Sequence, residues 1–228
     1  MAKRRRQRID TLIDFHVWEA RQAKKAARNP TEKQYENRDM QDMGIRSKIY
    51  LQMSRPFQFD KEKAIEALLY VAPRVRGGDM YTTLKLLYLA DKCHLHRYGR
   101  FIFGDRHWRL QYGPVPSGAY DLVKEARGEN FGRDAQAIRA LLNVQGNSLH
   151  PTREADRDVF SKSDLECLDE AIRESGTLSF SQMRALTHDA AFNATVEGQE
   201  ISPFAIAALA DNPASLLQHL SNAHPDRE

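Results

Sequence analysis

Side chains that could hold a metal ion follow one another in the run Asp91-Lys92-Cys93-His94-Leu95-His96, within a stretch whose pattern predicts a helix. Zinc sites need three or four carboxylate, thiolate or imidazole ligands that converge. Residues two apart on a helix point about 200° from one another, so His94 and His96 do not face one ion. Other ligands would have to come from the distant Asp105 and His107. We therefore expect neither metal nor cofactor, and interpret these residues as lining an interface or a hydrogen-bond network.

Sequence motifs of catalysis are missing from the chain. It contains no serine nucleophile elbow, no glycine-rich phosphate loop and no His-Glu-x-x-His helix. An enzyme that uses His94, His107 and His188 stays open as an alternative, which a measurement of bound metal on the purified protein would test. We predict that the protein is not an enzyme and that it works by binding another protein.

Asp91 lies seven residues after Leu84 and four before Leu95, inside the apolar stripe of the same predicted helix. Burying a bare carboxylate costs on the order of several kcal/mol, so this side chain must be paired or hydrogen-bonded. We expect a buried ion pair that fixes the fold, with direct contact to a partner protein as the alternative. The candidate partners in the sequence are Lys85, Arg97, Arg100 and Arg109.

The basic charge of the chain is concentrated at its start. Residues 1–50 hold 13 Lys and Arg against 7 Asp and Glu, whereas acidic residues outnumber basic ones in the rest. Such a segment can contact nucleic-acid phosphates, attract an acidic protein surface, or only raise solubility. Apolar periodicity predicts a helix from Ile9 to about Arg28. Phe15 and Trp18 lie at or beyond the edge of its stripe, where they could anchor a partner or pack on the main body.

Composition indicates a soluble, cytoplasmic globular protein, with 41% hydrophobic and 29% charged residues. No run reaches the roughly 18 apolar residues that a membrane-spanning helix needs, and no secretory cleavage site follows the basic start. The two cysteines, Cys93 and Cys167, are far apart in predicted helices and lack the spacing of a disulfide or zinc framework. We expect both to be reduced, structural thiols.

Helical periodicity continues beyond Arg55 and Pro56, where we place a domain boundary. One helix follows Asp60 and ends at Pro73 and Gly77-Gly78, and the strongest runs from about Asp79 to Tyr98. Its predicted buried face consists of Leu84, Leu87, Tyr88, Leu95 and Tyr98. Further helices are predicted at residues 117–127, 134–144, 163–174, 181–192 and 203–220.

Between these helices, residues 99–112 mix aromatic and branched side chains around Gly104-Asp105, which favours a short hairpin or an extended excursion. Gly113-Pro114-Val115-Pro116 should form an extended turn, with Pro116 in the first turn of the next helix. Ser163 and Glu166 have the spacing of a capping box. The predicted fold class is mainly α: a compact multi-helix domain over residues 56–228 with a short β-hairpin-like excursion, plus a basic N-terminal helical extension over residues 1–55.

The stretch from Lys85 to Asp121 resembles the Panacea domain, a phage-associated and antitoxin-associated bacterial family related to the SocA-type proteolytic adaptor. The likeness extends from about Lys61 to Ala210 and leaves residues 1–55 outside it. A weaker likeness lies at residues 186–189 and Phe192. The matching positions in the main stretch are Lys85, Leu86, Tyr88, Leu89, Asp91, His94, Tyr98, Gly99, Gly104, Asp105, Gly113, Pro114, Val115, Pro116, Ser117, Tyr120 and Asp121.

This resemblance implies the antitoxin of a type II toxin–antitoxin system, a helical protein that neutralises a cognate protein toxin by direct binding. Some relatives also hand the toxin to a protease, here of the Clp type, and no cofactor is implied. The expected partner-binding or motif residues are Phe15 and Trp18 together with Lys85, Tyr88, Asp91, His94, Tyr98, Gly104, Asp105, Gly113, Pro114, Val115, Pro116, Ser117 and Tyr120. A DNA-binding transcriptional regulator that uses the basic N-terminus is the alternative, although the main body is net negative and lacks helix-turn-helix spacing.

Overall fold

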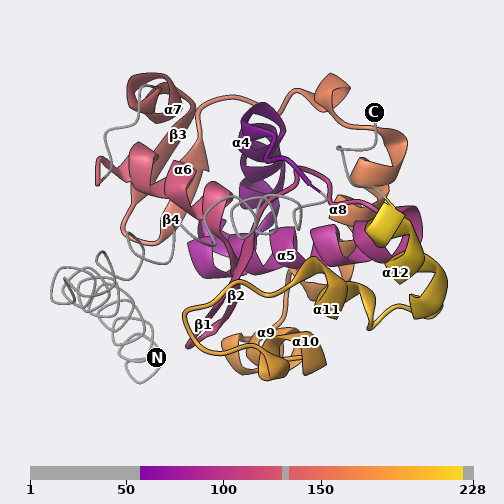
Figure 1. Ribbon diagram of the computed structural model, residues 1–228. Helices are drawn as coiled ribbons and strands as arrows, with labels where there is room; N and C mark the ends of the chain where they lie inside the picture. The colour runs from indigo at the N-terminus through magenta and orange to yellow at the C-terminus, as the bar shows by residue number, and fades with distance from the viewer. Residues whose placement is uncertain (1–56, 130–133, 223–228) are drawn as a thin grey trace, which may run out of the picture. The chain divides into compact units, whose positions relative to one another are not determined.

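A computed structural model describes residues 57–129 and 134–222 of the chain (Figure 1). The helix predicted from Ile9, the basic extension over residues 1–55, and the anchors Phe15 and Trp18 lie outside the described residues. The division of the chain near Arg55 stays a prediction. In the described ranges helices predominate and two small antiparallel strand pairs accompany them, which confirms the predicted mainly α fold. None of the helices described has the length and apolar character that crossing a bilayer requires.

Helix α4 (Lys61–Val71) begins where predicted, because the Asp60 side chain accepts a hydrogen bond from the Lys63 amide at 3.0 Å. Two short 3₁₀ turns follow, η1 (Ala72–Arg74) and η2 (Arg76–Gly78). They contain the Pro and Gly residues that the sequence indicated as the end of the helix. The first predicted helix of the domain is therefore confirmed.

Helix α5 (Met80–Tyr98) is the longest in the described part of the chain and is capped by Asp79, whose side chain accepts from the Thr82 amide at 3.1 Å. Leu84, Leu87, Tyr88 and Leu95 are buried as predicted. The prediction for Tyr98 is wrong, because this side chain is 44% exposed. It lies in the last turn of α5, where its hydroxyl donates to the solvent-facing carboxylate of Glu166 in helix α8 (Lys162–Ser175).

The excursion after α5 is a β-hairpin in which β1 (His107–Leu110) pairs with β2 (Gly113–Pro116) in antiparallel register. Leu110 lies opposite Gly113, so the turn falls at residues 111–112 and not at Gly104-Asp105. The hairpin was predicted, but its second strand was expected as a turn. Proline's fixed φ suits an extended strand equally well. Pro116 is the residue before α6 (Ser117–Arg127) and not part of its first turn.

A second hairpin was not predicted. Helix α7 (Ala135–Leu141) ends before residue 144, and the chain continues as β3 (Leu142–Gln145) and β4 (Ser148–Pro151). Gly146 and Asn147 form the two-residue connection, a combination that suits tight hairpins. Leu142 and Leu149 are buried on these strands. Apolar residues at these positions fit a helical period as well as a strand, so the pattern alone favoured the wrong element.

Helix α8 (Lys162–Ser175) follows the short turn η3 (Arg157–Val159). Its capping box is formed by Ser161 and Asp164, not by Ser163 and Glu166 as predicted. The Ser161 side chain accepts from the Asp164 amide at 3.2 Å, and the Asp164 side chain accepts from the Ser161 amide at 3.0 Å. Ser163 already lies in the first turn, where its hydroxyl faces α5.

The two last predicted helices are each divided in two. Residues 181–192 form the end of α9 (Phe180–Thr187) and the start of α10 (Ala190–Ala194), because Asp189 caps a new helix by accepting from the Phe192 amide at 3.0 Å. The region 203–220 contains α11 (Pro203–Ala207) and α12 (Pro213–Asn222). Pro213 cannot continue a preceding helix but fits the first position of a new one.

Helix α5 crosses the middle of the described domain, with α4 above it and the β1–β2 hairpin, α9 and α10 below it in Figure 1. Its closest helical neighbour is α8. On another side, Tyr88, Leu95 and Phe101 pack against Phe192 and a hydrophobic cluster from α11 and α12. Because α5 is surrounded on several sides, its polar residues that point inward must be satisfied by neighbouring elements.

Candidate partner-binding site

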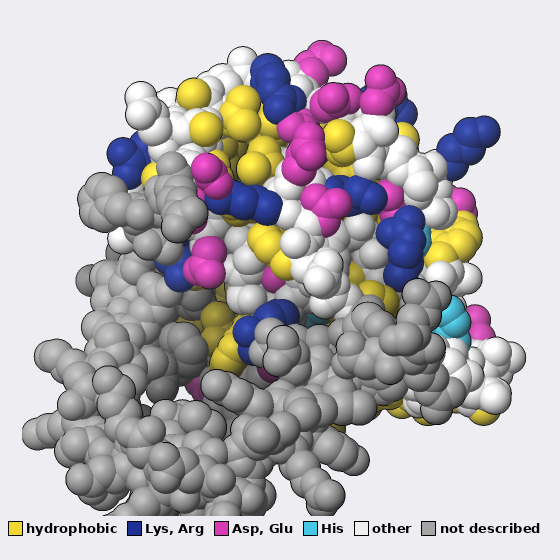
Figure 2. All heavy atoms as spheres, turned by 45° about the horizontal axis from the view of Figure 1, so that its top comes forward, with side chains coloured by type: hydrophobic (Ala, Val, Ile, Leu, Met, Phe, Trp, Pro, Cys, Tyr) yellow, Lys and Arg dark blue, Asp and Glu magenta, His cyan; other side chains and the backbone are white. Residues whose placement is uncertain are grey.

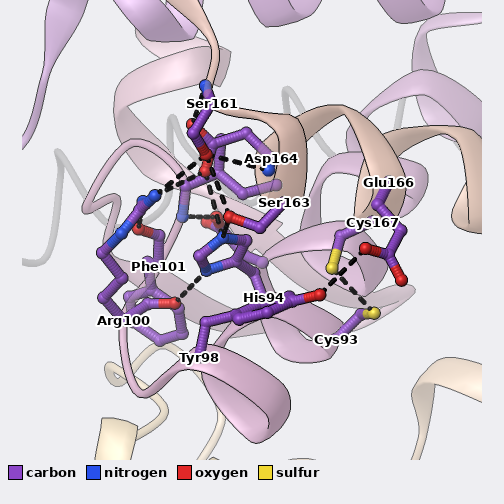
Figure 3. A network of polar contacts seen from close by, with 12 residues as sticks. Cys93, His94, Tyr98, Arg100, Phe101, Ser161, Ser163, Asp164, Glu166 and Cys167 are labelled. Atoms are coloured by element: carbon purple, nitrogen blue, oxygen red, sulfur yellow. Dashed lines mark hydrogen bonds and ion pairs between the residues drawn. The ribbon is translucent and has the colours of Figure 1, made fainter.

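Helices α5 and α8 meet along a line of polar contacts, which we call the α5–α8 seam. It comprises Cys93, His94, Arg97 and Tyr98 of α5 and Ser163, Asp164, Glu166, Cys167 and Glu170 of α8. Figure 3 shows these helices with His94 at the centre, turned toward the start of α8. Three of these residues are buried (His94, Asp164 and Cys167), three are exposed (Arg97, Tyr98 and Glu166), and the other three are half-buried.

His94 is one of the buried residues of the seam, and its side chain is fully shielded from solvent. Its Nδ1 lies 2.9 Å from the Arg100 carbonyl oxygen, so this nitrogen carries the hydrogen and donates. Its Nε2 lies 3.0 Å from Ser163 Oγ and 3.1 Å from Asp164 Oδ1. That nitrogen accepts from the serine hydroxyl when His94 is neutral, or donates to the carboxylate when His94 is protonated. The sequence-based interpretation of His94 as part of a hydrogen-bond network is confirmed.

Two cationic side chains approach the carboxylate of Asp164, although the Asp164 side chain is fully buried. Arg100 approaches Oδ1 at 2.8 Å and Lys63 of α4 approaches Oδ2 at 3.2 Å. Burial by itself would raise the pKa of Asp164, but hydrogen bonds from His94 and the Ser161 amide, with the two cations, hold that pKa well below its ordinary value. The carboxylate therefore stays ionised and joins α4, α5 and α8.

Charged side chains form the solvent-facing edge of the seam, which we call the charged rim: Arg97, Glu166 and Glu170. Arg97 makes a two-pronged ion pair with Glu170, with both nitrogen–oxygen distances at 2.6 Å. The Tyr98 hydroxyl donates to Glu166 at 2.9 Å, and its ring lies 4.7 Å from that of His94, centre to centre. A partly exposed aromatic side chain whose hydroxyl is held by a hydrogen bond is a typical anchor in protein–protein interfaces.

Cys93 and Cys167 also lie in the seam. Both are free thiols, and their sulfur atoms are 3.0 Å apart although the residues are 74 positions apart in the chain. Figure 3 shows them side by side, next to Glu166. The sequence offered no paired spacing, because the two cysteines come together only through the packing of α5 on α8.

Asp91 is fully buried, as the sequence predicted, but its neighbours are not the four predicted cations. Oδ1 accepts from the Ile102 amide at 2.7 Å. Oδ2 lies 3.2 Å from His107 Nε2, within ion-pair distance but without the alignment of a hydrogen bond. The chain turns back after α5, so the loop and β1 reach Asp91 and the cations do not. Asp91 thus connects α5 to the loop residue Ile102 and to His107, the first residue of β1.

Asp105 connects the loop after α5 to the start of α6 in a similar way. Its Oδ1 accepts from the Arg106 and Gly118 amides, both at 2.7 Å, and its Oδ2 accepts from the Ala119 amide at 2.8 Å. Pro116, the residue before α6, provides no side-chain cap, so Asp105 caps that helix from outside it. Burial raises the pKa of Asp105, while His107 and the three amides oppose this rise.

Lys85 fixes the hairpin to α5 from its buried position, since its ammonium group donates to the Pro114 carbonyl oxygen and lies 5.1 Å from the centre of the Tyr81 ring. Burial lowers the pKa of Lys85 well below its ordinary value. A Cβ at Gly113 would come within 3.1 Å of this side chain, and one at Gly104 would overlap the Gln58 carbonyl oxygen at 1.9 Å. These glycines permit close approach of backbone and side chain.

Most of the predicted site residues that the structure describes are therefore interior. Tyr98 is the one with an exposed side chain, and Gly104 and Ser117 are half-buried. The buried ones are Lys85, Tyr88, Asp91, His94, Asp105, Gly113, Pro114, Val115, Pro116 and Tyr120. Ser161, Asp164 and Cys167 were not predicted as site residues. The spacing of Ser161 and Asp164, with the acid three residues after the serine, was the available signal for a helix start.

The three histidines considered for an enzyme lie in separate surroundings. His107 packs edge-on against Tyr88 and Phe101, and His188 stacks on Phe192 at 4.0 Å. Burial, followed by the charge of Arg184, lowers the pKa of His188 to about 4. Among the residues described, no group of three or more His, Cys, Asp or Glu side chains is placed to hold a metal ion.

Comparison with known proteins adds one finding. Residues 84–192 match the family model described as antitoxin SocA-like, Panacea domain. The match runs from α5 to α10 and contains both the α5–α8 seam and the first hairpin, which confirms the resemblance found in the sequence. It is shorter than the stretch of likeness expected there. Neither the curated proteins nor the solved structures yielded a match.

Proposed function

Because residues 84–192 carry the Panacea domain of the SocA-like antitoxins, we propose that this protein is a cytoplasmic antitoxin that binds and neutralises a cognate protein toxin. It acts by direct binding, in the manner of a type II system, and without catalysis or a cofactor. The family match is the single observation that carries this proposal.

The burial of the motif residues supports two separate roles in the domain: buried residues position the binding surface, and exposed residues contact the toxin. Asp91, Asp105 and Lys85 attach the hairpin and α6 to α5, so they position the surface and do not touch the partner. Contact with the toxin then falls to solvent-facing side chains of the same elements. Phe15 and Trp18 stay in this proposal as additional anchors.

Tyr98 is the residue that we propose as the central contact. Tyr98 is 44% exposed and belongs to the family-like positions. Glu166 accepts a hydrogen bond from its hydroxyl, and the ring of His94 packs beside its ring. A side chain that is already ordered loses little conformational freedom on binding. The charged rim of Arg97, Glu166 and Glu170 around it would add specificity and affect the association rate.

The experiment is co-expression with the protein encoded beside this gene, read as rescue of growth and as co-purification of the two chains. Tyr98→Ala should weaken the complex by about tenfold or more, as removal of an interface anchor does, with the melting temperature little changed. Val196→Ala, at a 64% exposed apolar residue beyond the matched stretch, is the matched control and should bind normally. Absence of both rescue and co-purification with the wild-type chain would refute the antitoxin role.

Delivery of the toxin to a Clp-type protease is a further step of the same proposal. It predicts that the toxin disappears faster in cells that contain this protein, and that deletion of the protease abolishes the difference. An unchanged toxin half-life would contradict delivery to the protease, and the toxin would then be neutralised by binding alone.

DNA binding is the second candidate function, favoured by the excess of basic residues in residues 1–50. On the face in Figure 2, Lys and Arg are interspersed with Asp and Glu and form no continuous basic patch. Ion pairs such as Lys61–Asp134 and Arg153–Glu66 neutralise basic side chains of the domain. A mobility shift of promoter DNA that weakens steeply with salt would favour this function.

A further inference from the structure

The two thiols of the α5–α8 seam are arranged so that they can react with each other. The 3.0 Å between Cys93 Sγ and Cys167 Sγ is within thiol hydrogen-bond distance. Cys167 is fully buried, whereas Cys93 is half-buried and reaches the edge of the seam beside Arg97 and Glu170. A small oxidant can therefore approach Cys93, and Cys167 is within reach of whatever forms there.

The surroundings also give the two sulfur atoms different roles. The hydrogen bond between the two thiols lowers the pKa of Cys93, and the charge of Arg97 lowers it further, while burial, Glu170 and Glu166 oppose this fall. The same interaction and burial raise the pKa of Cys167. Cys93 is also the more accessible of the two thiols, and the thiolate is the reactive form, so Cys93 is the attacking group and Cys167 keeps its proton until the second step.

We propose that Cys93 and Cys167 form a dithiol modification site, which hydrogen peroxide or a related hydroperoxide oxidises to a disulfide between α5 and α8. The Cys93 thiolate attacks a peroxide oxygen and the O–O bond breaks. The products are a sulfenic acid on Cys93 and a hydroxide ion, which becomes water by taking up the proton that the Cys93 thiol released. The Cys167 sulfur then attacks the sulfenic sulfur. The S–O bond breaks, and hydroxide leaves as water with the proton of Cys167. Two thiols lose two electrons and two protons, and hydrogen peroxide becomes two water molecules.

The cross-link would join two helices that are distant in the sequence, so it would restrict the unfolded chain and resist separation of α5 from α8. The oxidised protein should therefore melt at a higher temperature, and a dithiol reductant should reverse the change. This inference stands independently of the antitoxin role, because it concerns only the seam.

The test uses the purified full-length chain, treated with hydrogen peroxide and then denatured for counting of thiols and for mass measurement. The chain has two cysteines, so the expected change is from two free thiols to none, with the loss of two hydrogen atoms from the monomer. Dithiothreitol should restore both thiols and the original melting temperature. Wild-type protein that keeps its thiols, or that gives only sulfinic acid or disulfide-linked dimers, would overturn the proposal.

Two variants separate the roles of the thiols. In Cys167→Ser a sulfenic acid should accumulate on Cys93 and react with dimedone, because the resolving thiol is gone. In Cys93→Ser the remaining buried thiol should be oxidised at least about tenfold more slowly. Should Cys167→Ser fail to fold, the wild-type linkage and Cys93→Ser still decide the matter. Equal oxidation rates for Cys93→Ser and the wild type would contradict the assignment of Cys93 as the attacking group.

Discussion

Replacing Asp105 tests whether this motif residue supports the fold or contacts a partner. Its side chain is 4% exposed, and its carboxylate accepts hydrogen bonds from the amides of Arg106, Gly118 and Ala119. Two of these amides belong to the first turn of α6, where no intrahelical acceptor exists. The arrangement makes the start of α6 depend on a residue that lies outside the helix.

The magnitude follows from the groups that Asp105→Ala leaves unpaired. Loss of a helix cap costs about 1–2 kcal/mol, and each buried donor without an acceptor costs about 1–3 kcal/mol. These contributions overlap, so we expect a loss of about 2–4 kcal/mol. In a domain of this size that corresponds to a fall of roughly 4–16 °C in melting temperature. Asp105→Asn keeps one acceptor oxygen and should cost roughly half as much.

Thermal and urea unfolding of the purified full-length chain provide the measurement. Asp121→Ala is the control, because that side chain is 53% exposed on the same helix and makes only a surface ion pair with Lys124. It should change stability by less than about 0.5 kcal/mol. If Asp105→Ala unfolds like the control, the capping argument is refuted. Weaker toxin binding at unchanged stability would instead place Asp105 in the interface.

Three further outcomes are expected. Asp91→Ala should lower the free energy of unfolding by about 2–4 kcal/mol, and Asp91→Asn by less, because the amide oxygen can still accept from Ile102. The folded state lowers the pKa of Asp164, so its contribution to stability is complete above the unfolded pKa of about 3.9 and disappears as the pH falls through the lower folded value. Melting temperatures from pH 5 to pH 2 should therefore fall less steeply for Asp164→Asn than for the wild type. A chain beginning near Arg55 should bind the toxin more slowly at low salt, and the difference should shrink at high salt.

Each of these predictions would be contradicted by a specific result. An unchanged melt of Asp91→Ala would mean that Asp91 is not satisfied as the structure indicates. Parallel melting curves for the wild type and Asp164→Asn would mean that this carboxylate does not govern acid unfolding. Equal association rates with and without residues 1–55 would place toxin recognition entirely in the domain, and failure of the shorter chain to fold would move the domain boundary.

The amino-acid sequence by itself determined the features that depend on neighbours along the chain. Asp60 and Asp79 mark the starts of α4 and α5 because a capping side chain acts within three residues of its own position. The burial of Asp91 was also readable, since its place in the apolar stripe sets the direction in which it points. The Panacea resemblance similarly depended on the order of motifs and not on packing.

Only the tertiary structure decided which groups satisfy the buried polar residues. Helical periodicity indicates which face of α5 is covered, but not which element covers it or in which register. The partners of Asp91 therefore proved to be Ile102 and His107, and the cap of α6 came from Asp105. For the same reason the sequence did not predict the contact of Cys93 with Cys167. The two residues are 74 positions apart and meet only because the chain folds back and places α8 against α5.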